Sequence, residues 1–160
     1  MDRSRIRTLF AEQGITGFKS ADDLADEVER GESTLVEVDG RLVRRVRTAA
    51  VIVTHEGRVL RETSYERDGK KIIRSLPWSI AEKCIGSESF EDAAMRALRE
   101  ELGVTGELVF VNEEVVLGDS PAYPGIALEN TVRTYRCALK EVRERYVEEQ
   151  ATGRIVWEWA

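Results

Sequence analysis

The sequence is poor in the residues that build several common kinds of catalytic or structural site. It holds one histidine, His55, and two cysteines, Cys84 and Cys137, among 160 residues. Ser-His-Asp and Cys-His mechanisms need a suitably placed histidine, but His55 lies in the turn-like stretch Thr54-His55-Glu56-Gly57. The two cysteines lack metal-ligand spacing. Triad hydrolases and structural zinc proteins are therefore poor candidates.

Long apolar runs and an excess of basic residues are also missing. No apolar stretch approaches the roughly 20 residues that a membrane-spanning helix needs, and the start, MDRSRIRTLF, lacks the apolar core of a signal peptide. The formal net charge is −6, whereas nucleic-acid binders cluster Lys and Arg. We therefore predict a cytoplasmic protein with neither a membrane nor a nucleic acid as partner.

The chain has the length and composition of a single packed domain, with 42% hydrophobic and 34% charged residues. Near its start, Ile6, Leu9 and Phe10 lie on one helical face before Gly14. Ser20 is placed to cap a second helix that ends at Gly31. We expect two short helices in this region.

Strand patterns follow. Asp39-Gly40 and Asp68-Gly69 are turn signals, because both residues of such a two-residue turn take positive φ angles. Five strands are predicted around them: Thr34–Val38, Leu42–Val46, Ala49–Thr54 (apolar throughout and so buried on both faces), Arg58–Glu66 and Lys70–Arg74.

The second half contains the best helix pattern in the sequence, from Phe90 to Leu102. Ser89 can cap it, Asp92 can complete a capping box, and Gly103 can end it. Its apolar stripe comprises Phe90, Ala94, Ala97, Leu98 and Leu102. The preceding segment, Leu76 to Ser89, has no period and is expected to be a loop. Further strands are predicted at Leu108–Leu117, Thr131–Leu139 (with Cys137 in the core) and Ile155–Trp159, which gives an α/β or α+β domain.

The segment from Glu82 to Val104, EKCIGSESFEDAAMRALREELGV, resembles the signature of the Nudix hydrolase family. That signature is Gly-x5-Glu-x7-Arg-Glu-U-x-Glu-Glu-x-Gly-U, where U is a bulky aliphatic residue. Seven of its nine specified positions match without gaps: Glu88, Arg96, Leu98, Glu100, Glu101, Gly103 and Val104.

Two positions depart from the signature. Glu82 stands in place of the opening Gly, and Ala97 in place of the first Glu of the helix. The stretch Trp78-Ser79-Ile80-Ala81 is also longer than the Gly-Gly turn common in the family. A glutamate at position 97 would lie one helical turn before Glu101 and join the same cluster. The sequence therefore departs from the signature at positions where the chemistry would be affected.

Glu100 and Glu101 can be assigned to a metal without the family. Mg²⁺ prefers hard oxygen ligands and is commonly shared between a few carboxylates and substrate phosphates. Consecutive residues lie about 100° apart around an α-helix, so the two side chains can converge on an ion beside it. The alternative is that Glu100 only forms an ion pair with Arg96, four residues earlier.

The resemblance implies an α/β fold, a Nudix-type α/β/α sandwich around a mixed β-sheet, over residues 46–160. Residues 1–45 would form an N-terminal extension of two short helices and a hairpin strand, which covers the sheet or forms a homodimer contact. Glu88 and Arg96 would tie the loop to the helix. Lys83 would contact a phosphate or remain a solvated surface residue. A late loop would add a carboxylate, for which Glu148 and Glu149 are candidates.

The implied function is metal-dependent hydrolysis of a diphosphate bond in a nucleoside diphosphate linked to another group. The residues that carry it would be Glu100, Glu101, Glu88 and Arg96, with Glu100 and Glu101 holding Mg²⁺ or Mn²⁺. The alternative is a catalytically impaired Nudix-like module that binds a nucleotide or a protein. The departures at positions 82 and 97 favour the alternative, and the Glu100–Glu101 pair favours the hydrolase.

Overall fold

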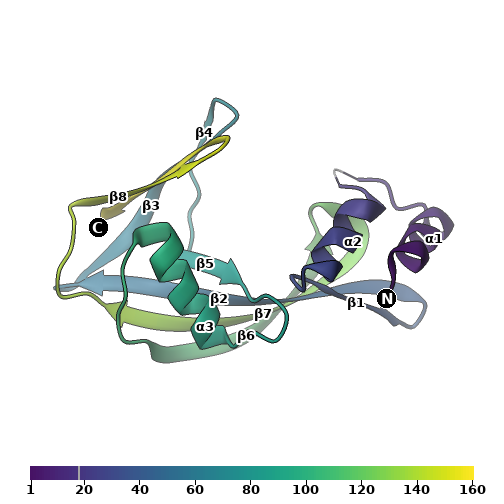
Figure 1. Cartoon of the computed structure of the whole chain (residues 1–160), viewed down its shortest axis with the longest axis horizontal. Helices are drawn as coiled ribbons and strands as arrows, with labels where there is room; N and C mark the ends of the chain where they lie inside the picture. The colour runs from purple at the N-terminus through teal and green to yellow at the C-terminus, as the bar shows by residue number, and fades with distance from the viewer. Residues whose placement is uncertain (18) are drawn as a thin grey trace. The chain divides into compact units, whose positions relative to one another are not determined.

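The computed structural model describes residues 1–17 and 19–160 and contains helices and a large β-sheet (Figure 1). The helices are α1 (Arg3–Gln13), α2 (Ala21–Glu29), α3 (Phe90–Ala97) and the π-helical segment η1 (Leu98–Leu102). The strands are β1 (Thr34–Val38), β2 (Arg41–His55), β3 (Arg58–Arg67), β4 (Lys70–Ile72), β5 (Ile80–Lys83), β6 (Val109–Ser120), β7 (Tyr123–Ala138), β8 (Arg145–Gln150) and β9 (Gly153–Trp159). The predicted mixture of helices with a sheet is confirmed.

The main path of the sheet runs in the order β6-β7-β2-β3-β9-β8, so β6 and β8 are its two end strands. Strands β1 and β5 pair with β2, and β4 pairs with β3. The chain divides into two compact units. Unit 1 comprises residues 1–48, 83–89 and 113–132, and unit 2 comprises residues 49–82, 90–112 and 133–160. The boundary expected between residues 45 and 46 falls inside strand β2.

The turns that the sequence signals form as expected. In the β1–β2 hairpin, Asp39 and Gly40 have φ angles of 50° and 75°, and Thr34 pairs with Arg45. Asp68 and Gly69 take the same left-handed conformation between β3 and β4. Positive φ at both central residues matches the twist of the flanking strands.

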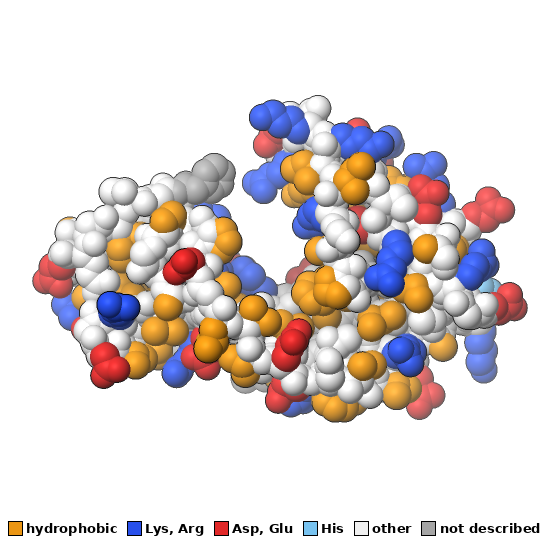
Figure 2. Space-filling model, turned by 180° about the vertical axis from the view of Figure 1, so that it is seen from behind, with side chains coloured by type: hydrophobic (Ala, Val, Ile, Leu, Met, Phe, Trp, Pro, Cys, Tyr) orange, Lys and Arg blue, Asp and Glu red, His pale blue; other side chains and the backbone are white. Residues whose placement is uncertain are grey.

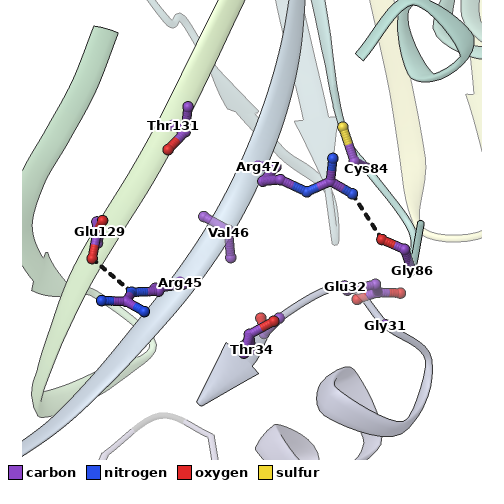
Figure 3. Close-up of a pocket in the computed structure, with 11 residues that line it drawn as sticks. Gly31, Glu32, Thr34, Arg45, Val46, Arg47, Cys84, Gly86, Glu129 and Thr131 are labelled. Atoms are coloured by element: carbon purple, nitrogen blue, oxygen red, sulfur yellow. Dashed lines mark hydrogen bonds and ion pairs between the residues drawn. The ribbon is translucent and has the colours of Figure 1, made fainter. Parts of the chain in front are cut away.

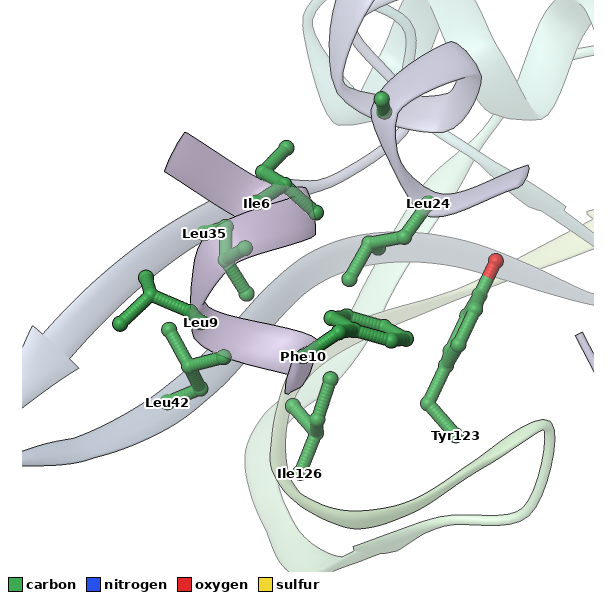
Figure 4. Close-up of a cluster of buried hydrophobic side chains, with 9 residues drawn as sticks. Ile6, Leu9, Phe10, Leu24, Leu35, Leu42, Tyr123 and Ile126 are labelled. Atoms are coloured by element: carbon green, nitrogen blue, oxygen red, sulfur yellow. The ribbon is translucent and has the colours of Figure 1, made fainter. Parts of the chain in front are cut away.

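In unit 1, α1 and α2 pack over a hydrophobic core. Ile6, Leu9 and Phe10 are buried, as their spacing predicts, and Ser20 and Asp23 form a reciprocal capping box at the start of α2. The core cluster joins side chains from both helices, from the β1–β2 hairpin and from β7 (Figure 4). Its members are Ile6, Leu9, Phe10, Leu24, Ala25, Leu35, Leu42, Tyr123 and Ile126.

A buried ionic network centred on Glu27 accompanies this core. Arg44 donates to the Glu27 carboxylate at 2.7 Å, Ser33 and Tyr123 donate hydroxyl hydrogen bonds at 3.0 Å, and Lys19 lies 3.1 Å away. Burial alone would raise the pKa of Glu27, but these hydrogen bonds and charges outweigh it and lower that pKa to about 2. Every oxygen of this buried carboxylate is therefore satisfied in its ionised form.

In unit 2, β3, β9 and β8 form an antiparallel ladder, in which Leu60 pairs with Trp159 and Tyr146 with Trp157. Trp157 is buried and donates its indole N–H to the carbonyl of Ser79 at 2.9 Å. The Ser79 hydroxyl donates to the Leu60 carbonyl at 2.6 Å and accepts from the Val53 amide at 2.9 Å. Ser79 thus fixes the start of β5 against the sheet.

Several boundaries differ from those expected. The segments predicted as strands at Leu42–Val46 and Ala49–Thr54 are one continuous strand, β2, in which Ala49, Ala50, Val51 and Val53 are fully buried. The stretch predicted as a loop contains β5, because its backbone pairs with β2. Strand β8 was not expected, so Glu148 and Glu149 lie on a strand and not in a loop.

Within residues 1–17 and 19–160, no helix is long and apolar enough to cross a membrane. Acidic and basic side chains are interspersed over the face shown in Figure 2.

Candidate functional site

The helix that carries the resemblance forms in two parts, α3 and then η1. Its predicted apolar stripe is confirmed, since Phe90, Ala94, Ala97, Leu98 and Leu102 are all buried. Gly103 ends the helix with φ at 67°, and its amide donates to the Arg99 carbonyl at 3.0 Å. The left-handed conformation requires a residue such as glycine at this position.

The last turn is π-helical, which the sequence did not indicate. The Val104 amide donates to the Leu98 carbonyl at 3.1 Å, around a wide turn that contains Glu100 and Glu101. A π-turn widens the helix and redirects its side chains, and such turns occur frequently at functional sites. The 100° spacing assumed for an ideal α-helix therefore does not describe this pair.

Glu100 and Glu101 have different environments. The Glu100 side chain is 59% exposed and lies 3.5 Å from Arg96, which is the ion pair expected for this spacing. Glu101 is half-buried. Both residues nevertheless line one hollow of about 350 Å³, together with Glu148 and Glu149. The two carboxylates proposed from the late segment do face this hollow, although β8 and not a loop carries them.

Glu101 has a strongly perturbed pKa. Its burial raises its pKa, and the negative charges of Glu82, Glu148 and Glu62 and a hydrogen bond with Glu82 raise it further, to about 9. Three glutamates from other elements therefore act on Glu101 of η1: Glu62 on β3, Glu82 on β5 and Glu148 on β8. We call these four residues the carboxylate cluster.

Two arginines hold the outer members of the carboxylate cluster. Arg96 lies 3.4 Å from Glu82, and the Nε of Arg74 donates to Glu62 at 2.8 Å. Glu148 differs from these, because its Oε2 is buried and has no hydrogen-bond partner. A buried carboxylate oxygen without a donor is unfavourable. A positively charged group bound there would remove that penalty.

The two residues that depart from the family signature, Ala97 and Glu82, have different surroundings. Ala97 is fully buried, with none of its surface exposed, so a carboxylate that began at this position would extend from a buried backbone. Glu82, which replaces the signature's opening Gly, contributes a carboxylate to the cluster from strand β5.

Glu88 organises the loop before the helix, since its carboxylate accepts a hydrogen bond from the Ile85 amide at 3.2 Å. The Glu88–Arg96 ion pair implied by the resemblance stays a prediction. Lys83 is half-buried. Burial lowers the pKa of Lys83, as does the charge of Arg44, while Glu27 and Glu32 act in the opposite direction. Its surroundings are thus those of unit 1, and they include acidic residues as well as basic ones.

The metal-ligand set predicted from the sequence is not present in finished form. In the described part of the chain, no three His, Cys, Asp or Glu side chains form a group that could hold a metal ion as they stand. Mg²⁺, however, usually keeps several waters and takes only one or two carboxylates together with substrate phosphates. The unpartnered oxygen of Glu148 and the proton held by Glu101 fit a cation bound in that manner.

A second hollow of about 350 Å³ in unit 2 also includes Glu101 in its wall. Tyr65 and Trp78 line it as aromatic groups, and the Arg74 guanidinium lies 4.3 Å from the centre of the Tyr65 ring. Leu76 and the buried Trp157 complete its apolar part. The aromatic groups are suited to a planar ligand, while Glu62 and Glu101 add carboxylates to the same wall and Glu62 is paired with Arg74.

Unit 1 contains a separate cavity of about 270 Å³ beside β2 (Figure 3). Arg45 pairs with Glu129 at 2.8 Å, and Arg47 donates to the Gly86 carbonyl at 2.7 Å. Cys84 also lines the cavity, as a buried cysteine outside any disulfide. Arg45 and Arg47 thus both have partners already, which makes the cavity a weaker candidate than the carboxylate cluster.

The structure adds functional candidates that the sequence did not identify. Glu62 and Arg74 belong to the β3–β4 region, which shows an ordinary hairpin pattern. Their proximity to Glu101 arises from the sheet order and leaves no local sequence signal. His55 is held by a hydrogen bond between its Nδ1 and the Leu139 carbonyl at 2.7 Å, in agreement with a structural role beside a turn.

In comparisons with known proteins, no protein-family model and no curated protein sequence matches this chain.

Proposed function

We propose that the carboxylate cluster binds a divalent cation, Mg²⁺ or Mn²⁺, and that the chain hydrolyses a diphosphate bond in a nucleoside diphosphate linked to another group. The observation that carries this proposal is Glu101, a half-buried carboxyl crowded by Glu82 and Glu148. Groups with strongly perturbed pKa values inside a hollow are characteristic of functional sites. The signature match from Glu82 to Val104 adds the reaction class and a Nudix-type sandwich fold.

Each residue of the site has a defined part in this proposal. A bound divalent ion would neutralise diphosphate oxygens and lower the pKa of a water molecule. Glu101 would give up its proton to bind the ion, and Glu148 would offer the oxygen that otherwise has no partner. Arg96 keeps Glu82 and Glu100 in place through its two ion pairs.

The substrate would occupy the second hollow. Trp78 would offer an aromatic surface to a planar base. Arg74 lies over the Tyr65 ring and is paired with Glu62, so it would exchange Glu62 for phosphate oxygens when the substrate binds. Glu101 belongs to the walls of both hollows. A diphosphate lying across Glu101 would thus be near the cation on one side and the aromatic groups on the other.

A second candidate function is binding without catalysis, as a nucleotide sensor or a protein-binding module. It is favoured by the buried Ala97, which removes one carboxylate of the family's set, and by the lack of a finished three-ligand group among the described residues. Fold resemblance does not decide between the two, because a fold can retain its ligand after losing its chemistry.

The test is turnover on a panel of nucleoside diphosphate derivatives with Mg²⁺ or Mn²⁺, measured as phosphate released after phosphatase treatment of the products. We expect hydrolysis of at least one member and its loss in the Glu101→Gln variant. Glu107→Gln, at an exposed glutamate outside the cluster, is the matched control and should keep full activity. Cation-dependent nucleotide binding with no turnover would favour the sensor, and the absence of both would refute the site.

A further inference from the structure

The charged side chain of Glu62 is turned toward the interior of unit 2. Only 3% of this side chain is exposed. Glu62 follows the fully buried Leu60 by two residues on β3, and alternate residues of a strand share a face. The register of β3 with β9 shifts between Glu62 and Ser64, and bulges of this kind redirect side chains beside active sites. A buried carboxylate in this position needs a charged partner.

Arg74 supplies the opposite charge and is itself open to solvent. Its Nε donates to one oxygen of Glu62 at 2.8 Å, and its Nη2 donates to the other oxygen. Such a two-pronged pair between a guanidinium and a carboxylate is strong. The Arg74 side chain is 40% exposed. A dissolved anion can therefore reach the arginine, whereas the glutamate behind it is enclosed.

The Glu62–Arg74 pair lies beside the carboxylate cluster. Both residues line the hollow that Glu101 also borders. The negative charge of Glu62 helps to raise the pKa of Glu101, and the charge of Glu101 in turn helps to raise the pKa of Arg74. Any change in the pairing of Glu62 therefore changes the charge that acts on Glu101.

We propose that the Glu62–Arg74 ion pair couples the binding of the two ligands of this site. An anionic group of the substrate that pairs with Arg74 would release Glu62, and the freed carboxylate would add its charge to the cluster that holds the cation. This inference rests on the function proposed above. Either ligand makes the Glu62–Arg74 pair less necessary, so each should favour the binding of the other, and the coupling is reciprocal.

This coupling agrees with the unfinished state of the metal site. Among the residues that the structure describes, no three acidic or other ligating side chains form a group ready for a metal ion. Two members of the cluster are instead held by arginines, Glu62 by Arg74 and Glu82 by Arg96. Arg96 is only 17% exposed. Arg74 is therefore the more accessible of the two to an incoming anion.

The first experiment measures ADP binding by calorimetry in EDTA, without a divalent cation. Glu62 competes with the anion for Arg74 in our proposal. Glu62→Gln should therefore bind ADP at least about fivefold more tightly than the parent chain, the lower end of typical coupling between ligands. Arg74→Gln should bind ADP at least about tenfold more weakly, because it removes the guanidinium that pairs with the phosphate oxygens.

The second experiment measures Mn²⁺ binding without ADP. Arg74→Gln leaves Glu62 buried without its counter-charge, which is unfavourable until a cation replaces it. This variant should therefore bind Mn²⁺ at least about fivefold more tightly than the parent. Mn²⁺ should also raise its Tm by more than that of the parent, because an ion that binds only the folded state stabilises it.

A third titration measures the coupling directly. A fixed concentration of ADP should increase the apparent Mn²⁺ affinity of the parent by more than that of Glu62→Gln. The complex that Mn²⁺ forms with ADP in solution is the same for both proteins under identical conditions, so it cancels in this comparison.

The pair Glu66–Arg154 provides matched controls. It joins the same two strands, β3 and β9, at 3.4 Å, and both side chains are exposed and outside the wall of the hollow. Glu66→Gln and Arg154→Gln should leave both affinities within about twofold of the parent, because an exposed ion pair contributes little. Urea unfolding verifies that each variant folds, and either member of the Glu62–Arg74 pair tests the proposal without the other.

Tighter ADP binding in Glu62→Gln and tighter Mn²⁺ binding in Arg74→Gln support the coupling. If the parent binds both ligands but neither variant binds its ligand more tightly than the parent, the coupling is wrong and the proposed function stands. If the parent binds neither Mn²⁺ nor ADP, the proposed function fails and the coupling fails with it.

Discussion

Glu101 and Glu82 share a hydrogen bond, although one lies in a π-helical turn and the other on strand β5. Two carboxyl groups can hydrogen-bond to each other only when one of them carries a proton. Burial and the charge of Glu148 favour protonation of Glu101 as well. These causes raise the pKa of Glu101, and in the proposed function a divalent cation would compete with its proton.

The first prediction concerns divalent-ion binding. Glu101→Gln should weaken Mn²⁺ binding by at least about tenfold, because it removes the one carboxyl that interacts with the other three. Glu100→Gln should have a smaller effect, since the Glu100 side chain is mostly exposed and paired with Arg96. Calorimetric titration with Mn²⁺ measures both affinities.

Glu107→Gln serves as the control for these titrations, because Glu107 is exposed and stands outside the carboxylate cluster. Equal Mn²⁺ affinity in Glu101→Gln and Glu107→Gln would show that the cluster is not the metal site.

The second prediction concerns the pH dependence of stability. The pKa of Glu101 is about 9 in the folded chain, against an ordinary value of 4.5. The folded state therefore binds more protons than the unfolded state between these values, and Glu101's contribution to stability falls as pH rises through that window. Glu101→Gln cannot ionise, so its free energy of unfolding should decline less between pH 5 and 9 (about the window set by the two pKa values).

Urea unfolding of the parent and of Glu101→Gln at a series of pH values measures the difference. The gap should widen in favour of the variant as pH increases, and Mn²⁺ should narrow it by stabilising the ionised parent. Parallel pH profiles for the two proteins would contradict the proposed protonation of Glu101.

The third prediction concerns position 97. On the signature alone, Ala97→Glu would restore a metal ligand, and a divalent ion would offset the added charge. Because Ala97 is fully buried, we instead expect the variant to lose at least about 3 kcal/mol of stability without recovery in Mg²⁺.

Thermal unfolding with and without Mg²⁺ is the measurement, and Arg99→Glu, at an exposed residue of the same helical segment, is the comparison. A large Mg²⁺-dependent rise in Tm for Ala97→Glu would show that this side chain reaches the ion after all.

The fourth prediction concerns the buried network in unit 1. The pKa of Glu27 is lowered to about 2 in the folded chain, from an ordinary 4.5. Its contribution to stability is thus complete above about pH 4.5 and is lost as pH falls toward 2. Glu27→Gln should cost about 3 kcal/mol at neutral pH, since Arg44 is left buried without its counter-charge.

Denaturant unfolding measures the free energy of unfolding of the parent and of Glu27→Gln at pH 7 and at pH 3, which lie about either side of the ordinary carboxyl pKa. The loss in Glu27→Gln should be larger at neutral pH. Glu12→Gln, whose carboxylate is exposed and 4.0 Å from Arg5, should change stability by less than about 0.5 kcal/mol. Similar losses of stability in Glu27→Gln and Glu12→Gln would show that the buried network does not stabilise the fold.

Most of the local structure could be predicted from the sequence, because its causes are local. Neighbouring backbone geometry determines the turns at Asp39-Gly40 and Asp68-Gly69. It also determines the cap at Ser20 and the end of the second-half helix at Gly103. The apolar stripes of α1 and of the helix from Phe90 to Leu102 follow from helical periodicity. Boundaries were less accurate, because β5 and β8 form through pairing with distant strands.

The candidate site was only partly visible in the sequence. Glu100 and Glu101 were identified from their place in the signature, and Glu148 from its position near the final strand, but Glu62 and Arg74 carry no local signal. Glu82 was noted only as a departure from the signature. Its side chain matters because β5 brings it against η1, a contact that requires the folded sheet.

By itself, the sequence determined where the turns, caps and apolar faces lie, because backbone sterics and side-chain periodicity act over a few residues. Only the tertiary structure decided that Ala97 is enclosed, that four glutamates from β3, β5, η1 and β8 share one environment, and that β6 is an edge. These properties depend on which strands pair across long stretches of chain, and electrostatic coupling and solvent exposure exist only after that pairing has formed.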